Sequence, residues 1–407
     1  MRIYLHDYGG HAFIVELARA LAERGHTVRY GFSATNEAPQ GTLSAQPGDP
    51  PSLSFDPVVT PAVDKRARSL AGLVRRQRAE ARFGRAAAQH VRQWNAEVVV
   101  AANCGLDVLA ALQHAARDQN AAFVNWLQDV HSVGTRAVLG RRFGTWGDTL
   151  GRAFEAREGR LLRRADAVVA ITDAFRPILA RWRVAPARVT VIENWAPLAR
   201  IPQRPRDNAW ARAHGLADRP VVLYSGTLGM KHDPAGLAAL ADALGESGDA
   251  RLVVVSSGED ADWLASEKRA RGLDALVLLP FQPFEDFPDV LGTADVLVAV
   301  LEPDASAVSV PSKVLAYLCA GRPAVLSVPP ENLAARIVTR ERAGVVVPPG
   351  DPAALADVVG ALLGDERQRV AMGAAGRAYA ERAFDLGAIA DRFEAVLAEA
   401  VATCSRP

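Results

Sequence analysis

Ser309-Val310-Pro311-Ser312-Lys313-Val314-Leu315-Ala316-Tyr317-Leu318-Cys319-Ala320-Gly321-Arg322-Pro323-Ala324-Val325 is the stretch that decides the fold. It predicts a turn of small residues, a short helix, and a Gly-x-Pro turn leading into an apolar strand. The N–H groups of such a helix start, expected here at Val310 to Val314, form an anion site together with the positive end of the helix dipole. Because Lys313 adds a full positive charge, we expect a nucleotide diphosphate as the ligand. A capped helix with an exposed lysine is the alternative interpretation of this turn alone.

A second turn of the same character lies within residues 222–233, where an apolar strand runs into a Gly-x-x-Gly loop. Gly226 and Gly229 allow close approach of the backbone, and Lys231 supplies a charge. Asp233-Pro234 is a favourable N-cap and first position for the helix that follows. Two lysine-bearing turns at strand ends favour one ligand held at the carboxyl edge of one parallel sheet.

The length and composition predict two globular domains. The chain has 407 residues, of which 49% are hydrophobic and 23% charged, and this length exceeds what one ordinary core serves. No run approaches the roughly 20 apolar residues of a transmembrane helix, so we expect a cytoplasmic protein. The three cysteines have no pairing or metal spacing, which predicts core thiols at Cys104 and Cys319 and a tail thiol at Cys404.

Short apolar runs alternate with helical patterns along the whole chain, which predicts parallel sheets. The predicted strands are Arg2–Leu5, Thr27–Phe32, Glu97–Ala102, Ala122–Trp126, Ala167–Ile171, Val189–Ile192, Val221–Tyr224, Leu252–Ser256, Ala275–Leu279, Val296–Val300, Ala324–Val328 and Gly344–Val347. The Pro- and Arg-rich segment Ala196–Arg206 separates two series. We therefore expect an α/β protein of two doubly wound Rossmann-like domains, 1–200 and 201–384, with Ala34–Pro61 as a loop.

Six short motifs, in this order, carry a resemblance to a known family. They are Tyr8-Gly9-Gly10-His11, Ala165–Thr172, Val191–Trp195, Ser225–Lys231, the Pro311-Ser312-Lys313 turn with Gly321-Arg322-Pro323, and Ala343–Pro352. Through them the chain resembles the retaining GT-B glycosyltransferases of family 4, in particular the branch that builds bacterial surface polysaccharides.

The resemblance implies that the two domains face each other across a cleft, and that a C-terminal helix, residues 385–407, completes the N-terminal domain. It also implies that the C-terminal domain binds the nucleotide sugar. Lys231 would contact the donor phosphates, together with Gly226 and the backbone of Val310, Pro311, Ser312 and Lys313. Gly9 and Gly10 would form a loop facing the diphosphate, where a side chain would obstruct closure. His11 is open to a plainer interpretation as the start of a helix.

The sequence departs from the family pattern in the donor site. Thr227 stands where the family usually has Arg or Asn, and the two carboxylates spaced Glu-x7-Glu align with Val308 and Ala316. Lys313 stands where the family commonly has an apolar residue. Glu302 is a candidate to replace a missing carboxylate, and a solvated loop carboxylate is the alternative. These departures leave the sugar and the grip on the nucleoside undetermined.

On the acceptor side, the family's His-Asp pair is Gln128-Asp129 here, with His131 beyond it. The resemblance makes Asp129 the first candidate to orient the acceptor hydroxyl and His131 the second. The alternatives are an N-cap for Asp129 and a surface position for His131.

Positive charge is concentrated in the first half of the chain. Residues 1–200 carry 27 Lys and Arg against 18 Asp and Glu, and residues 201–407 carry 20 against 28. The basic residues form two groups: Lys65, Arg66, Arg68, Arg75, Arg76, Arg78, Arg82, Arg85 and Arg92; and Arg136, Arg141, Arg142, Arg152, Arg157, Arg160, Arg163 and Arg164. Such a face favours peripheral contact with an anionic inner membrane surface, and a solvated helix face is the alternative. No motif spacing indicates nucleic acid.

The sequence thus predicts a retaining, hexosyltransferase-type glycosyltransferase that moves a sugar from a nucleotide diphosphate to a hydroxyl, on a lipid-linked or oligosaccharide intermediate of polysaccharide biosynthesis. We expect no cofactor and no metal, because the one Asp-x-Asp, Asp260-Ala261-Asp262, falls at a helix start. Three alternatives stay open: a transferase for a small secondary metabolite, a nucleotide-sugar 2-epimerase, and a non-catalytic nucleotide-sugar-binding protein.

Overall fold

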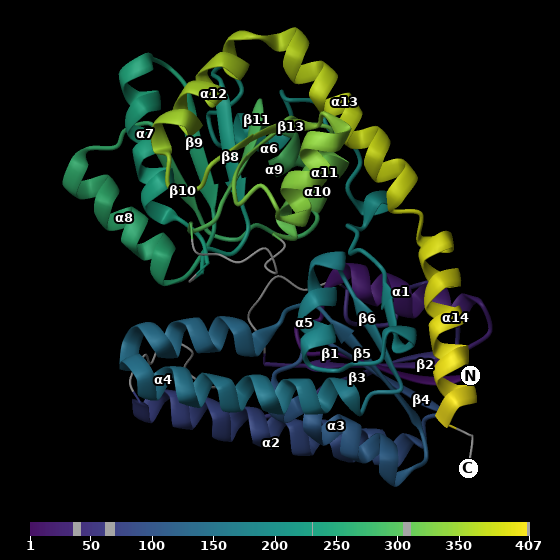
Figure 1. The fold of residues 1–407 in the computed structure, drawn as a ribbon. Coiled ribbons are helices and arrows are strands. Elements are labelled where there is room, and N and C mark those ends of the chain that lie inside the picture. Colours follow the sequence, from purple (N-terminus) through teal and green to yellow (C-terminus); the bar gives the residue numbers. More distant parts are fainter. Residues whose placement is uncertain (36–41, 62–69, 230, 304–310, 405–407) are drawn as a thin grey trace. The chain divides into compact units, whose positions relative to one another are not determined.

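The computed structural model describes residues 1–35, 42–61, 70–229, 231–303 and 311–404. It divides into two compact units. Unit 1 comprises Met1–Glu193 and Asp385–Pro407, and unit 2 comprises Asn194–Phe384 (Figure 1).

Unit 1 is built on a parallel sheet in the order β3-β2-β1-β4-β5-β6-β7. Its strands are β1 (Arg2–Asp7), β2 (Thr27–Ser33), β3 (Leu53–Val58), β4 (Val98–Ala102), β5 (Ala122–Leu127), β6 (Ala167–Ala170) and β7 (Val189–Val191). The central strands β4, β5 and β6 are buried along their whole length. Continuous apolar runs of this kind are typical of parallel strands covered on both faces.

Helices cover both faces of this sheet. They are α1 (Ala12–Glu23), α2 (Leu70–Trp94), α3 (Leu106–Asp118), α4 (His131–Arg163), α5 (Arg176–Arg181) and α14 (Leu386–Cys404). The helix α3 packs against both α2 and α4 on one side, and α14 packs against α1 on the other. The ring of Phe393 in α14 lies 4.6 Å from that of Trp126 in β5, centroid to centroid.

One strand of unit 1 was not predicted, since β3 lies inside the segment that we interpreted as a loop. Among the described strands it pairs with β2 alone and is the edge of the sheet. Its Pro57 lacks a backbone donor and is exposed, which an edge strand tolerates. Pro57 and the neighbouring Asp56 hid the strand pattern in the sequence.

The helix α4 is a hairpin of two helical segments that meet at Gly144, where the backbone turns through φ 59° and ψ −136°. A Cβ atom at Gly147 would lie 1.9 Å from the carbonyl oxygen of Leu139, and one at Gly151 would lie 2.7 Å from Cα of Arg136. The two segments therefore pack in direct backbone contact, which only glycine permits at these positions.

Unit 2 has a second parallel sheet in the order β10-β9-β8-β11-β12-β13. Its strands are β8 (Val221–Ser225), β9 (Arg251–Val255), β10 (Leu276–Leu279), β11 (Val296–Val300), β12 (Ala324–Ser327) and β13 (Gly344–Val347). Its helices are α6 (Ala209–Ala213), α7 (Pro234–Ser247), α8 (Glu259–Arg271), α9 (Phe287–Gly292), α10 (Lys313–Ala320), α11 (Leu333–Glu341), α12 (Pro352–Gly364) and α13 (Glu366–Ala383). Three 3-10 turns complete the described elements of the chain: Asp173–Phe175, Pro186–Arg188 and Leu198–Arg200.

Both sheets reverse their winding direction at one place, between β1 and β4 in unit 1 and between β8 and β11 in unit 2. The predicted α/β fold with two doubly wound sheets is confirmed. At such a switch point the loops after the two central strands diverge and leave room for a ligand at the carboxyl edge. The predicted helix starts at Pro234 and near Asp260 are also found, as α7 and α8.

Candidate functional site

In unit 2 the strands β8 and β11 separate at the switch point. They pair at Val222 and Leu223, and beyond that the hydroxyl of Tyr317 in α10 fills the gap between them. This hydroxyl accepts the N–H of Ser225 at 3.1 Å and donates to the carbonyl oxygen of Val298 at 3.2 Å or of Ser225 at 3.3 Å. The helix α10 is thereby fixed across the two strand ends.

Lys313, the first residue of α10, reaches from that helix into the loop after β8. Its Nζ donates to the hydroxyl of Tyr224 at 2.7 Å and lies 3.4 Å from the carbonyl oxygen of Thr227. The ammonium group also lies 4.5 Å from the centre of the Tyr224 ring. The Tyr224 hydroxyl in turn donates to the Thr227 carbonyl at 2.9 Å. The two lysine turns predicted from the sequence therefore meet at one point, through the side chain of Lys313.

His232 is a third partner of this lysine. Its Nε2 lies 2.9 Å from Nζ of Lys313, and its Nδ1 lies 3.1 Å from the carbonyl oxygen of Gly229. An ammonium group has only donors, so Nε2 accepts and Nδ1 carries the proton. This tautomer donates to the Gly229 carbonyl and does not accept from the Gly229 amide, which lies 3.0 Å from the same nitrogen. Burial lowers the pKa of His232 to about 3, and the Lys313 charge acts in the same direction.

Lys313 is half-buried among neutral partners, and burial lowers its pKa from 10.5 to about 7. An ammonium group in this position lacks the hydration that it has in bulk water. Within the described residues, no carboxylate forms an ion pair with it. A bound anion would supply the missing charge.

The glycine after β8 is required by the same arrangement. Gly226 has φ +136°, and a Cβ atom there would lie 2.9 Å from Cε of Lys313. Its amide donates to the carbonyl oxygen of Val255 at 3.0 Å, and the amide of Leu228, two residues further on, donates to Oγ of Ser256 at 3.2 Å. The loop is therefore tied to the end of β9 as well as to α10.

The other described residues of unit 2 predicted to bind the donor lie in the loops next to Lys313. Thr227 and Lys231 are exposed, and Glu302 is half-buried with its amide bonded to the Lys231 carbonyl at 2.9 Å. Ser312 is the N-cap of α10 and Pro311 is buried.

Val310 lies outside the described residues, as does Val308. The expectation of an outward N–H at Val314 is wrong, because that amide bonds to the Pro311 carbonyl at 3.1 Å. Since proline has no N–H, the described donors of the turn are the amides of Ser312 and Lys313.

In unit 1 the loop after β1 is organised by Asp7, which is fully buried. Its carboxylate accepts from the amides of Gly9 (3.1 Å) and His11 (2.5 Å) and from the hydroxyl of Tyr30 (2.9 Å), and it lies 3.0 Å from Nδ1 of His11. Burial opposes the charged carboxylate, but the His11 charge and these bonds keep the pKa of Asp7 below its usual value. Burial likewise opposes a charged His11, yet Asp7 raises the pKa of His11.

Gly9 and Gly10 are required here for a local reason. A Cβ atom at Gly9 would lie 2.0 Å from Cε1 of His11, and Gly10 has φ +70°. His11 is the N-cap residue of α1, although its side chain does not cap the helix. The backbone of His11 begins the helix, as the alternative interpretation had it, but its side chain contacts Asp7.

The loop after β5 holds the predicted acceptor residues. Asp129 is half-buried, and His131 is the first residue of α4. The cap of this helix is Glu158, from the second segment of the hairpin, whose carboxylate accepts the amides of His131 at 3.2 Å and Ser132 at 2.9 Å. The N-cap position itself is Val130, so the alternative of an N-cap at Asp129 is wrong. Burial raises the pKa of Glu158, although these amides and His131 oppose the shift.

Glu158, Asp129 and His131 line one small hollow of about 10 Å³ together with Asn103, Asn125 and Gln128. This volume is about that of one water molecule. Its polar lining lies at the carboxyl ends of β4 and β5. The strand β4 is the neighbour of β1, which the Gly9-Gly10 loop follows. Asn103 connects the two, since its Nδ2 lies 3.4 Å from both ring nitrogens of His11.

Comparison with known proteins places this geometry in a family. Residues 9–195 match the family described as Glycosyl transferase 4-like domain, and residues 219–365 match Glycosyl transferases group 1. The chain belongs to the group 1 (GT4) glycosyltransferases. The first range begins at Gly9, just after β1, and includes β4, and the second range includes both β8 and β11.

Two relatives of this glycosyltransferase are 27% identical to it. WcaI of Escherichia coli K12, by name a colanic acid biosynthesis glycosyl transferase, matches over 244 residues, 58% of each chain. Alpha-D-kanosaminyltransferase of Streptomyces kanamyceticus matches over 251 residues, 60% of this chain and 62% of the relative. The match thus spans about three fifths of either curated relative. Among solved structures, HepE of Anabaena in complex with UDP and glucose has a TM-score of 0.72 at 17% identity, covering 98% of this chain and 99% of HepE, and shares the GT-B fold.

Sequence reasoning missed three residues of the two candidate sites. Asp7 and Glu158 organise the two loops of unit 1, and His232 completes the Lys313 cluster in unit 2. A signal existed for Asp7, a carboxylate at the end of the first strand and two residues before Gly9-Gly10. Glu158 and Ser132 are 26 positions apart in the sequence, which leaves no local signature.

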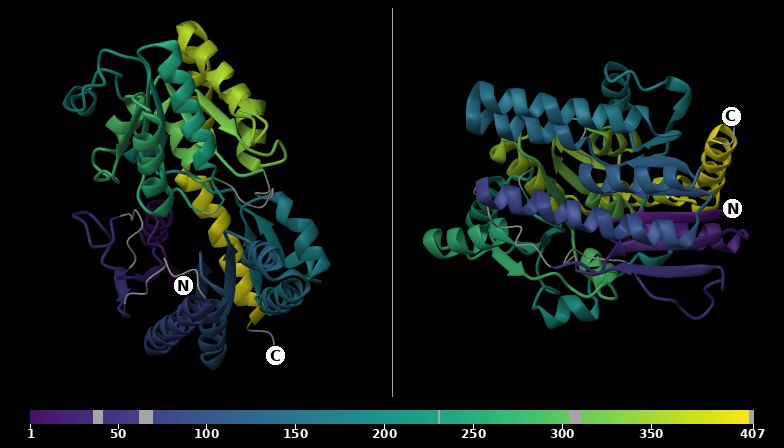
Figure 2. Two further views of the ribbon diagram at one scale, coloured as in Figure 1. Left: turned by 90° about the vertical axis from the view of Figure 1, so that its left-hand side faces the viewer. Right: turned by 90° about the horizontal axis from the view of Figure 1, so that it is seen from below.

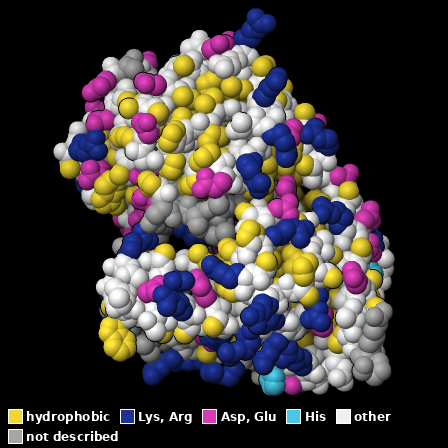
Figure 3. Space-filling model, viewed as in Figure 1, with side chains coloured by type: hydrophobic (Ala, Val, Ile, Leu, Met, Phe, Trp, Pro, Cys, Tyr) yellow, Lys and Arg dark blue, Asp and Glu magenta, His cyan; other side chains and the backbone are white. Residues whose placement is uncertain are grey.

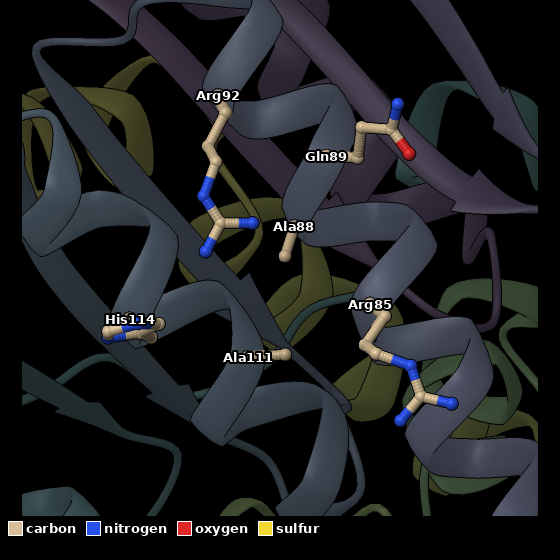
Figure 4. A pocket seen from close by; sticks show the side chains of 6 residues that line it. All are labelled: Arg85, Ala88, Gln89, Arg92, Ala111 and His114. Atoms are coloured by element: carbon tan, nitrogen blue, oxygen red, sulfur yellow. The ribbon is translucent and has the colours of Figure 1, made fainter.

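Arg85 and Arg92, which belong to the first of the two basic groups predicted from the sequence, line a surface groove between α2 and α3 of unit 1. It holds about 350 Å³ and is formed by Arg85, Ala88, Gln89 and Arg92 of α2 and by Ala111 and His114 of α3 (Figure 4). Of the predicted basic group, Lys65, Arg66 and Arg68 lie outside the described residues. Among the described residues, no three His, Cys, Asp or Glu side chains are arranged to hold a metal ion, and no helix is long and apolar enough to cross a bilayer.

Proposed function

We infer that this protein transfers a sugar from a nucleotide-diphosphate donor to a hydroxyl group of an acceptor, with retention at the anomeric carbon as the family implies. The observation that carries the inference is the Lys313 ammonium, held at the switch point of unit 2 without a carboxylate partner among the described residues. The departing diphosphate needs positive charge and backbone donors, and Lys313 with the Ser312 and Lys313 amides offers both.

The donor is proposed to lie across the ends of β8 and β11, with Gly226 and Thr227 on one side and the start of α10 on the other. Lys231 is exposed on the same loop, and its carbonyl is bonded to the amide of Glu302. This bond places the Glu302 backbone beside the second lysine turn. In this proposal Lys231 contacts the phosphates, and Glu302 contacts the sugar in place of the carboxylates that the family has at 308 and 316.

On the acceptor side, we propose that Asp129 orients the acceptor hydroxyl and that His131 assists. Glu158 acts as a positioning residue, because it holds the backbone of His131 and Ser132. The relatives favour two acceptor classes. WcaI supports an intermediate of polysaccharide biosynthesis, lipid-linked or oligosaccharide, and the kanosaminyltransferase supports a small secondary metabolite.

The first experiment is a thermal-shift panel of nucleoside diphosphates and nucleotide sugars, with UDP and UDP-glucose included because HepE binds UDP and glucose. Lys313→Met and Lys231→Met should reduce the shift. The matched control is Lys268→Met, since Lys268 bonds to the carbonyl of Leu276 at the opposite, amino edge of the sheet. A panel without any shift would contradict the donor site.

Turnover then separates the remaining candidates. A transferase releases nucleoside diphosphate faster when a suitable acceptor is added. An epimerase would convert the donor sugar without an acceptor, and a binding protein would show the shift but no conversion. Product analysis with a lipid-linked acceptor and with a small, diffusible hydroxyl-bearing acceptor distinguishes the two acceptor classes.

A further inference from the structure

The tip of the α4 hairpin exposes large apolar side chains on a rigid support. Trp146 is 83% exposed, Leu150 52%, Val138 38% and Phe143 36%. The support is rigid because Gly147 and Gly151 bring the two helical segments into backbone contact. Large apolar side chains held together on a surface mark an interaction site.

The hairpin is also cross-linked by charge. Arg136 in the first segment pairs with Asp148 at 2.7 Å and with Glu155 at 3.3 Å in the second, and Asp148 also pairs with Arg152 at 2.7 Å. These pairs satisfy Asp148, the one acidic residue between Val138 and Leu150. Over residues 136–155 the sequence has four arginines against two acidic residues, so the hairpin end carries net positive charge, and Arg141 and Arg142 are exposed on it.

We propose that this tip inserts into the interface of an anionic membrane. A tryptophan, a phenylalanine and a leucine beside two arginines match the two layers of such an interface: the aromatic rings reach the acyl boundary, and the guanidinium groups remain among the headgroup phosphates. The guanidinium of Arg142 already lies over the Phe143 ring at 5.5 Å, so charge and apolar surface are presented together.

The surface of α2, in the same helical layer of unit 1 as α4, also favours an anionic membrane as the partner. Exposed arginines of α2 recur at helical spacing along one face: Arg75, Arg78, Arg82, Arg85 and Arg92. The helices α2 and α4 lie in one layer with α3 packed against both, as Figures 1 and 2 show. Figure 3 shows Lys and Arg side chains gathered over the lower part of that view, where this layer lies. An extended basic layer with an apolar tip fits a lipid surface.

A second copy of the chain fits the tip less well. A symmetric dimer through the tip would bring Arg141 and Arg142 of both copies into one interface, because a two-fold interface pairs a patch with itself. Like charges brought together in this way weaken association. The bilayer is therefore the occupant that the charge favours.

The inference deepens the proposed function, on which it rests for the lipid-linked acceptor, but its test uses no sugar donor. The full chain is mixed with phosphatidylcholine vesicles, with or without phosphatidylglycerol, and bound protein is measured by flotation. We expect binding to the anionic vesicles, and at least tenfold weaker partitioning for the double variant Phe143→Ser/Trp146→Ser, equivalent to about 1.4 kcal/mol. The matched control is Trp263→Ser, which changes a 39% exposed tryptophan of α8 in unit 2 and should bind as the parent does.

A second measurement reports insertion itself. Brominated lipids quench tryptophans that reach the acyl boundary, so quenching should fall in Trp146→Phe and persist in Trp263→Phe. Melting curves without vesicles should stay unchanged, since both residues are exposed.

Three results would overturn the proposal. One is a parent chain that binds neither vesicle type. Another is a double variant that binds as well as the parent, while Arg141→Gln/Arg142→Gln does not, which would mean charge contact without insertion. The third is self-association in sedimentation that Trp146→Ser abolishes, which would make a second copy the partner. A loss of donor binding or turnover, by contrast, would leave the vesicle result standing.

Discussion

Replacing Lys313 with methionine should raise the free energy of unfolding near pH 6 and leave it unchanged or lower near pH 10.5. Methionine fills a similar volume and carries no charge. The folded protein lowers the pKa of Lys313 from 10.5 to about 7 because of burial. Each pKa unit corresponds to about 1.4 kcal/mol, so holding the charged form in the folded state costs about 5 kcal/mol below pH 7.

The sign follows from proton binding. Between about pH 7 and pH 10.5 the unfolded chain keeps the Lys313 proton and the folded chain has lost it, so stability rises with pH across that window. Below pH 7 Lys313 is protonated in both the folded and the unfolded state, so the full cost of burying the charge applies. Above pH 10.5 it is protonated in neither state, and this cost is absent. The substitution also removes the bonds to Tyr224 and His232, each contributing about 0.5–1.5 kcal/mol. The expected net gain near pH 6 is therefore about 2–4 kcal/mol.

Urea denaturation of the two proteins at several pH values measures this difference. The substitution also removes the Lys313 charge that helps to lower the pKa of His232, but burial is the larger cause of that shift and is retained, so between pH 6 and pH 10.5 the difference reports mainly on Lys313. A difference that stays constant from pH 6 to pH 10.5, or a variant that is less stable near pH 6, would refute the reasoning.

Ligand binding supplies a second readout of the same residue. A diphosphate needs the protonated lysine, so its affinity for the parent should fall up to about tenfold per pH unit above 7 until the bound-state pKa is reached. Calorimetric titration with UDP should show this slope in the parent and a flatter one in the methionine variant. A parent affinity that does not vary over this range would show that the Lys313 charge does not contact the phosphates.

Three further predictions concern single positions. Gly226→Ala should cost about 1–3 kcal/mol of stability, because φ is +136° and the new Cβ meets Lys313, and it should weaken UDP binding. Gly229→Ala, with no atom within 4 Å of the new Cβ, is its control in the stability assay. Glu158→Gln should lower the unfolding free energy by about 1–3 kcal/mol, because the NH2 group of the glutamine would face a backbone N–H donor of α4. In the same variant, turnover should fall while the affinity for UDP stays the same. His6 is fully buried with its pKa lowered to about 4, so the parent should lose about 3 kcal/mol as pH falls from 6.5 to 4, and His6→Leu should remove that part of the loss in acid denaturation. An equal acid loss in both proteins would contradict the last of these.

The sequence was a good guide to the fold because buried parallel strands are apolar throughout and helices start at recognisable caps. The twelve predicted strands all occur, and Asp233-Pro234 starts α7 as expected. The strand β3 escaped because an edge strand need not be apolar or free of proline. Local pattern therefore identifies central strands better than edges.

The sites were less predictable, because their decisive contacts join residues far apart in the chain. Lys313 and His232 are 81 residues apart, and Glu158 reaches Ser132 across a hairpin whose turn is a single glycine. The sequence indicated the charge on the turn, but neither the burial of Lys313 nor its neutral partners follows from spacing. Packing across the sheet decides both.

The contrast between the two switch points bears on whether Lys313 binds a ligand or supports the fold. In unit 1 the buried carboxylate of Asp7 is matched by His11 and by N–H donors, so that site is electrostatically complete without a ligand. In unit 2, Lys313 faces a hydroxyl, a carbonyl and a neutral imidazole, and in the described residues no acid compensates its charge. A lysine that only supported the fold would be stabilised by such a partner, and its loss would destabilise the protein at every pH. A lysine that awaits an anion destabilises the empty protein and recovers that cost on binding. A methionine variant that gains stability near pH 6 and loses affinity for UDP would therefore show both halves of a binding role in one residue.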